Sequence, residues 1–165
     1  RMRKALLPAL AALALFAACS SETAEEPAAA ETEAVTETPP AQAPAMPPRT
    51  PSPEGARVFF ISPSDGDTVS NPVKVVFGIE GMSVAPAGDQ TPHSGHHHII
   101  IDADLPDLNF PIPASDNYVH FGDGRTETEI TLQPGEHTLQ MLLGDHTHIP
   151  HDPPIMSEKI TVFVE

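Results

Sequence analysis

The chain has 165 residues, one cysteine, nine histidines and a formal net charge of −15 at pH 7. This excess of negative charge disfavours binding to nucleic acid and favours binding to cations. With a single cysteine the chain cannot form an internal disulfide, an iron–sulfur cluster or a cysteine-based zinc site.

The first predicted element is a secretory signal peptide at residues 1–18. A basic start precedes an apolar stretch that is too short to be a membrane span and that ends in small residues. The run Phe16-Ala17-Ala18-Cys19 resembles the lipobox of bacterial lipoproteins. The resemblance implies cleavage before Cys19, acylation of this cysteine and stable attachment to a lipid bilayer. With Ser20 next, we expect a lipid-anchored cell-envelope protein, on the periplasmic face of the outer membrane if the host has two membranes.

Residues 19–54 form the second predicted element, a tether that begins at the lipidated Cys19. Ala, Glu, Thr and Pro dominate this stretch, and apolar clusters are almost absent. Such a segment cannot bury enough apolar surface to offset the entropy lost on folding. We therefore predict a disordered linker that ends at Glu54.

Residues 55–165 are predicted to form one all-β domain. Short runs rich in Val, Ile, Phe and Thr are separated by Gly, Pro and Asp, and no helical period is present. Several runs alternate apolar and polar residues with the period of two that a half-buried strand requires. The seven expected strands cover residues 57–61, 73–80, 96–102, 117–121, 126–132, 137–143 and 157–164.

Seven short strands at this spacing predict an immunoglobulin-like β-sandwich. Residues 132–145, with their Pro-Gly turn, resemble the corner between the fifth and sixth strands of bacterial immunoglobulin-like domains. The fourth strand could belong to either sheet. In this topology the connections at 81–95, 122–125 and 144–156 lie at one end of the sandwich, because successive strands alternate in direction.

Eight of the nine histidines are expected at that end. Seven of them lie in two short runs, at residues 93–98 and 146–151, and His120 ends the fourth strand. Imidazole nitrogen is a common ligand of zinc and copper, and four such nitrogen atoms suit either ion. The sequence therefore predicts a copper or zinc site where the two runs meet.

The period of two along a strand puts His96 and His98 on one face and His97 on the other. The pair His146 and His148 repeats this spacing. Asp145 could bind the ion or orient an imidazole, and His137, at the opposite end, is predicted to hold a corner by a hydrogen bond. The predicted metal ligands are His96, His98, His146 and His148, with His97, His120, His151 and Asp145 as secondary candidates.

Six segments together resemble a known family. They are residues 81–88, the Gly-His-His-His run at 95–98, residues 101–102, 104–106 and 120–122, and the run Gly-Asp-His-Thr-His-Ile-Pro-His at 144–151. They are similar to an uncharacterised bacterial family of secreted or lipid-anchored proteins of the domain-of-unknown-function 4399 type. The resemblance covers nearly all of residues 56–165 and implies no activity.

Three functions remain open. The first is a lipid-anchored envelope module that binds Cu(II) or Zn(II) as a metal chaperone, buffer or sensor. The second is an adhesion or scaffold module that docks an envelope protein or glycan at the same end of the sandwich. The third is a metal-dependent enzyme in which an open metal position activates water, although the chain has no common hydrolase or phosphate-loop motif and no catalytic residue is identified.

Overall fold

The computed structural model describes residues 48–165, so the predicted signal peptide, Cys19 and most of the predicted tether lie outside the described residues. Within this range the chain forms strands and no helix, and it therefore offers no helix that could span a bilayer. The strands are β1 (Arg57–Ser62), β2 (Thr68–Val69), β3 (Val73–Glu80), β4 (Ser83–Val84), β5 (Ser94–Ile101), β6 (Tyr118–Phe121), β7 (Glu127–Ile130), β8 (Gly135–Gly144) and β9 (Ile160–Val164).

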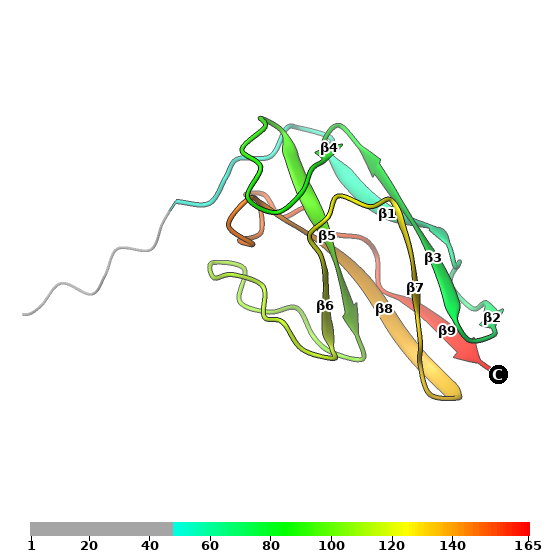
Figure 1. Ribbon diagram of the computed structural model, residues 1–165. Coiled ribbons are helices and arrows are strands. Elements are labelled where there is room, and N and C mark those ends of the chain that lie inside the picture. The colour runs from blue at the N-terminus through cyan, green and yellow to red at the C-terminus, as the bar shows by residue number, and fades with distance from the viewer. Residues whose placement is uncertain (1–47) are drawn as a thin grey trace, which may run out of the picture. The chain divides into compact units, whose positions relative to one another are not determined.

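The strands form two sheets that pack face to face (Figure 1). One sheet has the order β1-β3-β7, and the other runs β2-β9-β8-β5, with β4 and β6 both paired to the far edge of β5. This is the predicted all-β, immunoglobulin-like sandwich. All seven predicted strands are present, and the short strands β2 and β4 are additions that the sequence did not indicate. The fourth predicted strand, β6, belongs to the sheet of β5.

The main core lies between the two sheets. Val73, Val75 and Phe77 of β3 are buried, and so are Ile160 and Val162 of β9, as the period of two in both segments predicts. Because the intervening residues of β3 and β9 are more exposed, these two strands each have one face in the core and one toward solvent.

Strand β5 differs because it is buried along its whole length. Ile99 joins the main core, whereas Ile100 packs with Leu142 and Ile112 in a second cluster on the outer face of the sheet. Ile112 belongs to the loop of residues 102–117, which folds back beside this sheet (Figure 1). The outer face of the sheet is therefore covered by a loop instead of being open to solvent.

Ordered contacts begin before Gly55, where the sequence placed the start of the domain. The backbone amide of Ser52 donates to the carbonyl of Asp152 at 3.0 Å, and the amide of Asp152 donates to the carbonyl of Thr50 at 2.9 Å. The end of the predicted tether is therefore bonded to the loop between β8 and β9. Composition does not reveal this contact, because its partners lie about a hundred residues apart in the sequence.

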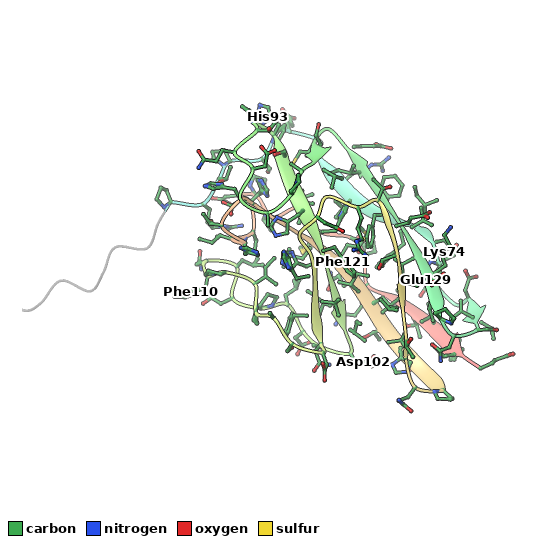
Figure 2. The ribbon with its side chains drawn as sticks, viewed as in Figure 1. Lys74, His93, Asp102, Phe110, Phe121 and Glu129 are labelled. Carbon is green, nitrogen blue, oxygen red and sulfur yellow. The ribbon has the colours of Figure 1, made fainter. Side chains whose placement is uncertain are left out.

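His137 holds the opposite end of the sandwich from the histidine runs. Its Nδ1 lies 2.6 Å from the Oδ2 of Asp102, and its Nε2 lies 2.8 Å from the carbonyl of Gln133. Figure 2 shows Asp102 and His93 at opposite ends of β5. Since both ring nitrogen atoms face acceptors, the protonated ring is favoured, and the hydrogen bond to Asp102 is the main cause that raises the pKa of His137.

Asp102→Asn should reduce the pH-dependent contribution of the His137–Asp102 hydrogen bond to the stability of the fold. Asp102 has a φ of +52°, which asparagine tolerates, so the backbone is preserved. A raised histidine pKa contributes stability that is fully present below about pH 6.5 and is lost as the pH rises through the folded-state value. Because the pair is partly exposed, we expect urea unfolding to show a loss about 0.5 kcal/mol larger at pH 5.5 than at pH 9. An equal loss at both pH values would contradict this role.

Candidate metal centre

Four imidazole rings lie together on the outer face of the sheet. His96 and His98 come from β5, His120 comes from β6, and His148 comes from the loop between β8 and β9. The centroids of the six ring pairs lie between 4.8 and 6.1 Å apart. Ligand nitrogen atoms of His96, His98 and His120 all lie within 4.8 Å of one another. We call these four residues the histidine cluster. Three of them, His96, His98 and His120, are close enough to hold a metal ion, and the ring of His148 lies beside them.

Strand pairing brings three of these rings together. His96 and His98 are two residues apart on β5 and share the outer face. His98 lies directly opposite His120 in the antiparallel pair of β5 and β6, so their side chains point the same way. On the other edge, His96 lies opposite Gly144, the last residue of β8, after which the chain turns into the loop that carries His148.

Two glycines leave the space that the rings occupy. A Cβ atom added at Gly144 would lie 2.8 Å from Cε1 of His98, and one added at Gly122 would collide with the ring of His120. Neither glycine has a positive φ, so the need for glycine at these positions is steric. Any larger residue would displace a ring of the cluster.

Asp145 orders the loop that carries His148. Its Oδ1 accepts hydrogen bonds from the amide and hydroxyl of Thr147, at 2.8 and 2.7 Å, and from the amide of Ile149 at 3.1 Å. Its Oδ2 accepts a hydrogen bond of 2.6 Å from the hydroxyl of Thr50. Burial alone would raise the pKa of Asp145, but these bonds lower it. Both oxygen atoms of the carboxylate accept hydrogen bonds, so Asp145 acts as the support of the loop. Within residues 48–165, Asp145 is not among the residues whose ligand atoms group closely enough to hold a metal ion.

His148 itself has a φ of +69°, which is uncommon for a residue with a side chain. Its amide donates to the carbonyl of Asp145 at 2.9 Å, and its carbonyl accepts from the amide of Ile112 at 2.8 Å. Contacts on both sides therefore hold the backbone in this conformation. Strained backbone that the surroundings enforce is frequent at functional sites.

Burial keeps the two central rings neutral. His96 and His98 are 0% and 1% exposed, and within residues 48–165 neither ring has a hydrogen-bond partner for either nitrogen atom. Burial is the main cause that lowers the pKa of His96 to about 4 and that of His98 to about 3, and the neighbouring histidines of the cluster lower both further. Neutral imidazole is the form that binds a metal, so the rings need no deprotonation at pH 7.

His146, one of the four predicted ligands, lies outside the cluster. It lines a separate cavity of about 210 Å³ together with His93 and Asp145. The sequence paired His146 with His148 because they lie two positions apart. That spacing places two side chains on the same face in a strand, but this segment is a loop. The fourth ring of the cluster is that of His120, a secondary candidate, which β6 brings to β5.

The two other candidate histidines are buried elsewhere. His97 faces the core, where its ring centroid lies 4.5 Å from that of Phe77, and burial lowers its pKa to about 4. His151 is fully buried, and its backbone carbonyl accepts a hydrogen bond from the side chain of Arg49. Burial is also the main cause that lowers the pKa of His151. Neither ring is part of the histidine cluster.

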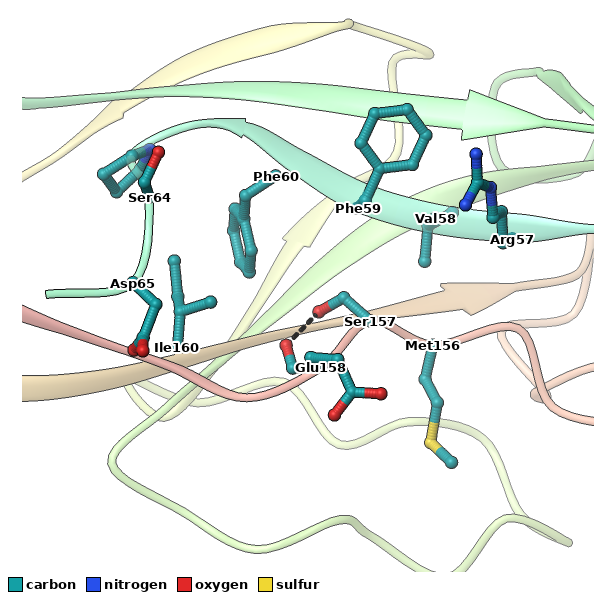
Figure 3. A pocket seen from close by; sticks show the side chains of 11 residues that line it. Arg57, Val58, Phe59, Phe60, Ser64, Asp65, Met156, Ser157, Glu158 and Ile160 are labelled. Carbon is teal, nitrogen blue, oxygen red and sulfur yellow. Dashed lines mark hydrogen bonds between the residues drawn. The ribbon is translucent and has the colours of Figure 1, made fainter.

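A cavity of about 450 Å³ lies between β1 and the segment that leads into β9 (Figure 3). Phe60 and Ile160 line it, together with Met156 and the hydroxyl of Ser157, which donates to the carbonyl of Glu158 at 2.7 Å. No histidine lines this cavity. It is a groove at the open edge between the two sheets and adds nothing to the cluster.

The fold and the site define a β-sandwich domain with four histidines grouped on the outer face of one sheet. A family model matches residues 75–165, and the chain belongs to this family, which is described as "Domain of unknown function (DUF4399)". The match extends from β3 to the end of the chain and contains all four histidines of the cluster. Comparisons with curated proteins and with solved structures found no match.

The lowered pKa values of the cluster predict how stability depends on pH. Below about pH 6.5 the unfolded chain takes up protons that buried His96 and His98 do not, so stability falls as the pH falls from about 6.5 toward 4. Each such histidine contributes about 1.4 kcal/mol per pH unit within this window. His98→Gln should therefore flatten the slope by about that amount when urea unfolding is measured in chelator at pH 6.5, 5.5 and 4.5.

His137→Gln is the control. The pKa of His137 is raised, mainly by the hydrogen bond to Asp102, so its contribution to stability is already fully present below about pH 6.5 and its removal should leave the slope as in the wild type. If His98→Gln leaves the slope unchanged, His98 takes up its proton in the folded chain as readily as in the unfolded chain. Burial then does not hold the ring neutral, which would contradict the prediction.

Proposed function

We propose that this domain binds one transition-metal ion, Zn(II) or Cu(II), through His96, His98, His120 and His148. The observation that carries the proposal is the convergence of four imidazole rings from three separate parts of the chain, two of them buried with unpartnered nitrogen atoms. A buried polar atom without a partner costs about 1–3 kcal/mol. A metal ion would bind one nitrogen atom of each buried ring and would supply the missing partner at that atom.

The arrangement of the rings favours a tetrahedral ion. With metal–nitrogen bonds of about 2.0–2.1 Å, a tetrahedral ion holds all imidazole centres about 5.2 Å apart, whereas a square-planar ion holds two opposite pairs at about 6.4 Å. Five of the six ring pairs lie 4.8–5.0 Å apart, and only His98 and His148 are separated by 6.1 Å. This supports Zn(II) as the better geometric fit, while Cu(II) has the higher intrinsic affinity for nitrogen ligands.

The partial exposure of the rings supports a site whose metal ion can exchange with the surrounding solution. His96 and His98 are buried, but His120 is exposed and His148 is half-buried, so one side of the cluster is open to solvent. Structural zinc sites are usually closed, with four protein ligands out of reach of water. An open side suits a metal chaperone, buffer or sensor, which must take up and release its ion.

The same exposure argues against the adhesion or scaffold function. A docking surface needs side chains that a partner can touch, and two of the four rings are 0–1% exposed. A partner that contacts only His120 and His148 would leave the nitrogen atoms of His96 and His98 unsatisfied. The metal-binding function accounts for all four rings.

Titration of the purified chain with Zn(II) or Cu(II), followed by calorimetry, should give a dissociation constant below about 10 µM. His120→Ala and His148→Ala should each weaken binding at least about tenfold, which corresponds to about 1.4 kcal/mol. His146→Ala is the matched control, because it removes a histidine from the same loop but not from the cluster, and it should change affinity less than about threefold. Strong visible absorption of the Co(II)-loaded chain would report four-coordinate binding.

Binding weaker than this limit would overturn the proposal, and so would an equal effect of His146→Ala and His148→Ala. Gly144→Ala gives a second test that removes no nitrogen atom. Since the added Cβ would lie 2.8 Å from Cε1 of His98, this variant should also weaken binding, through displacement of the ring.

We also propose that Cys19 carries a lipid anchor that holds the domain at the cell envelope. The sequence around Cys19 supports this, and the acidic composition fits a domain held in solution above a bilayer rather than on its anionic surface. Metabolic labelling with a fatty acid should label the wild-type protein but not Cys19→Ser. Unlabelled wild-type protein, or membrane attachment that survives Cys19→Ser, would count against the anchor.

A further inference from the structure

Residues 49–52, here called the N-terminal clasp, are bonded to the loop that carries His148. Besides the two backbone bonds between the clasp and Asp152, the side chain of Arg49 donates from Nε to the carbonyl of Pro150 at 3.0 Å and from Nη2 to the carbonyl of His151. The clasp precedes β1 and lies outside the part of the chain that the family model matches. It therefore joins two segments about a hundred residues apart in the sequence.

Thr50 connects the clasp to the histidine cluster. Its hydroxyl donates to the Oδ2 of Asp145 at 2.6 Å, and the same carboxylate orders the residues around His148 through its Oδ1. Asp145 is 3% exposed, so most of this carboxylate is withdrawn from bulk solvent. The hydroxyl of Thr50 is the only side-chain donor to Oδ2 among residues 48–165.

We propose that Thr50, acting through Asp145, is a positioning residue for His148, so that the segment before the sandwich completes the metal site. This rests on the proposed metal-binding function. Without the hydroxyl, the buried Oδ2 has to turn toward another donor, and this rotation moves the bonds that the amides of Thr147 and Ile149 donate to Oδ1. His148 has a strained backbone and is the residue of the cluster whose place depends most on these bonds.

The test compares three substitutions at the clasp of the full chain. Thr50→Val keeps the shape and removes the hydroxyl, whereas Thr50→Ser keeps the hydroxyl. Ser52→Ala removes a clasp hydrogen bond of 2.8 Å to the carbonyl of Pro153, which has no link to Asp145. Thr50→Val should weaken Zn(II) binding about three- to tenfold and should change the visible spectrum of the Co(II)-loaded chain. This loss of affinity lies at or below the low end of the range for residues that support metal ligands without touching the metal. Thr50→Ser and Ser52→Ala should retain wild-type affinity and spectrum.

A measurement without metal separates this inference from the proposed function. In the metal-free chain, Thr50→Val should shift the imidazole nuclear magnetic resonance signals of His148 and leave those of His137, at the other end of the sandwich, unchanged. If the wild type binds no metal, the proposed function fails, and these signals still decide whether Thr50 positions His148. The inference is overturned if Thr50→Val leaves the His148 signals unchanged, or if Ser52→Ala alters them and the affinity as much as Thr50→Val does.

Discussion

The pairing of β5 with β8 on one edge and with β6 on the other is the constraint on which the site depends. This pairing fixes which residues of β5 face the core and which face outward, because a slip of one residue would exchange the two sets. In the observed register Ile99 enters the core, and His96 and His98 face outward beside His120. The apolar packing of one face therefore sets the positions of the ligand nitrogen atoms on the other.

Local patterns in the sequence were enough to predict the strands, the sandwich and the shared face of His96 and His98. They were not enough for His146 and His148, because a period of two has meaning only in a strand and these residues lie in a loop. The position of His148 depends on hydrogen bonds to Asp145, and one of these comes from Thr50. The sequence assigned Thr50 to a disordered linker, and only the three-dimensional contact shows its connection to the loop.

The position of His120 beside His98 could not be predicted from local sequence patterns either. Its place beside His98 follows from the membership of β6 in the sheet of β5, and the sequence left this membership open. Short strands in sandwiches carry too few residues for their pattern to indicate a partner sheet. The glycines carried a usable signal, however, since Gly122 follows β6, Gly144 ends β8, and each leaves room for a ring.

The buried imidazoles are a cost that the apolar core must offset. His96 and His98 are withdrawn from water without gaining hydrogen bonds within the described residues, and apolar side chains at these positions would pack without that cost. An ion bound by all four rings would join β5, β6 and the β8–β9 loop, and would stabilise the folded chain in proportion to the logarithm of its concentration above its dissociation constant. The clasp is bonded to the same loop, so the clasp and a bound metal ion would both stabilise the β8–β9 loop. Through the stability of this loop, the residues before the sandwich and the metal ion would influence each other.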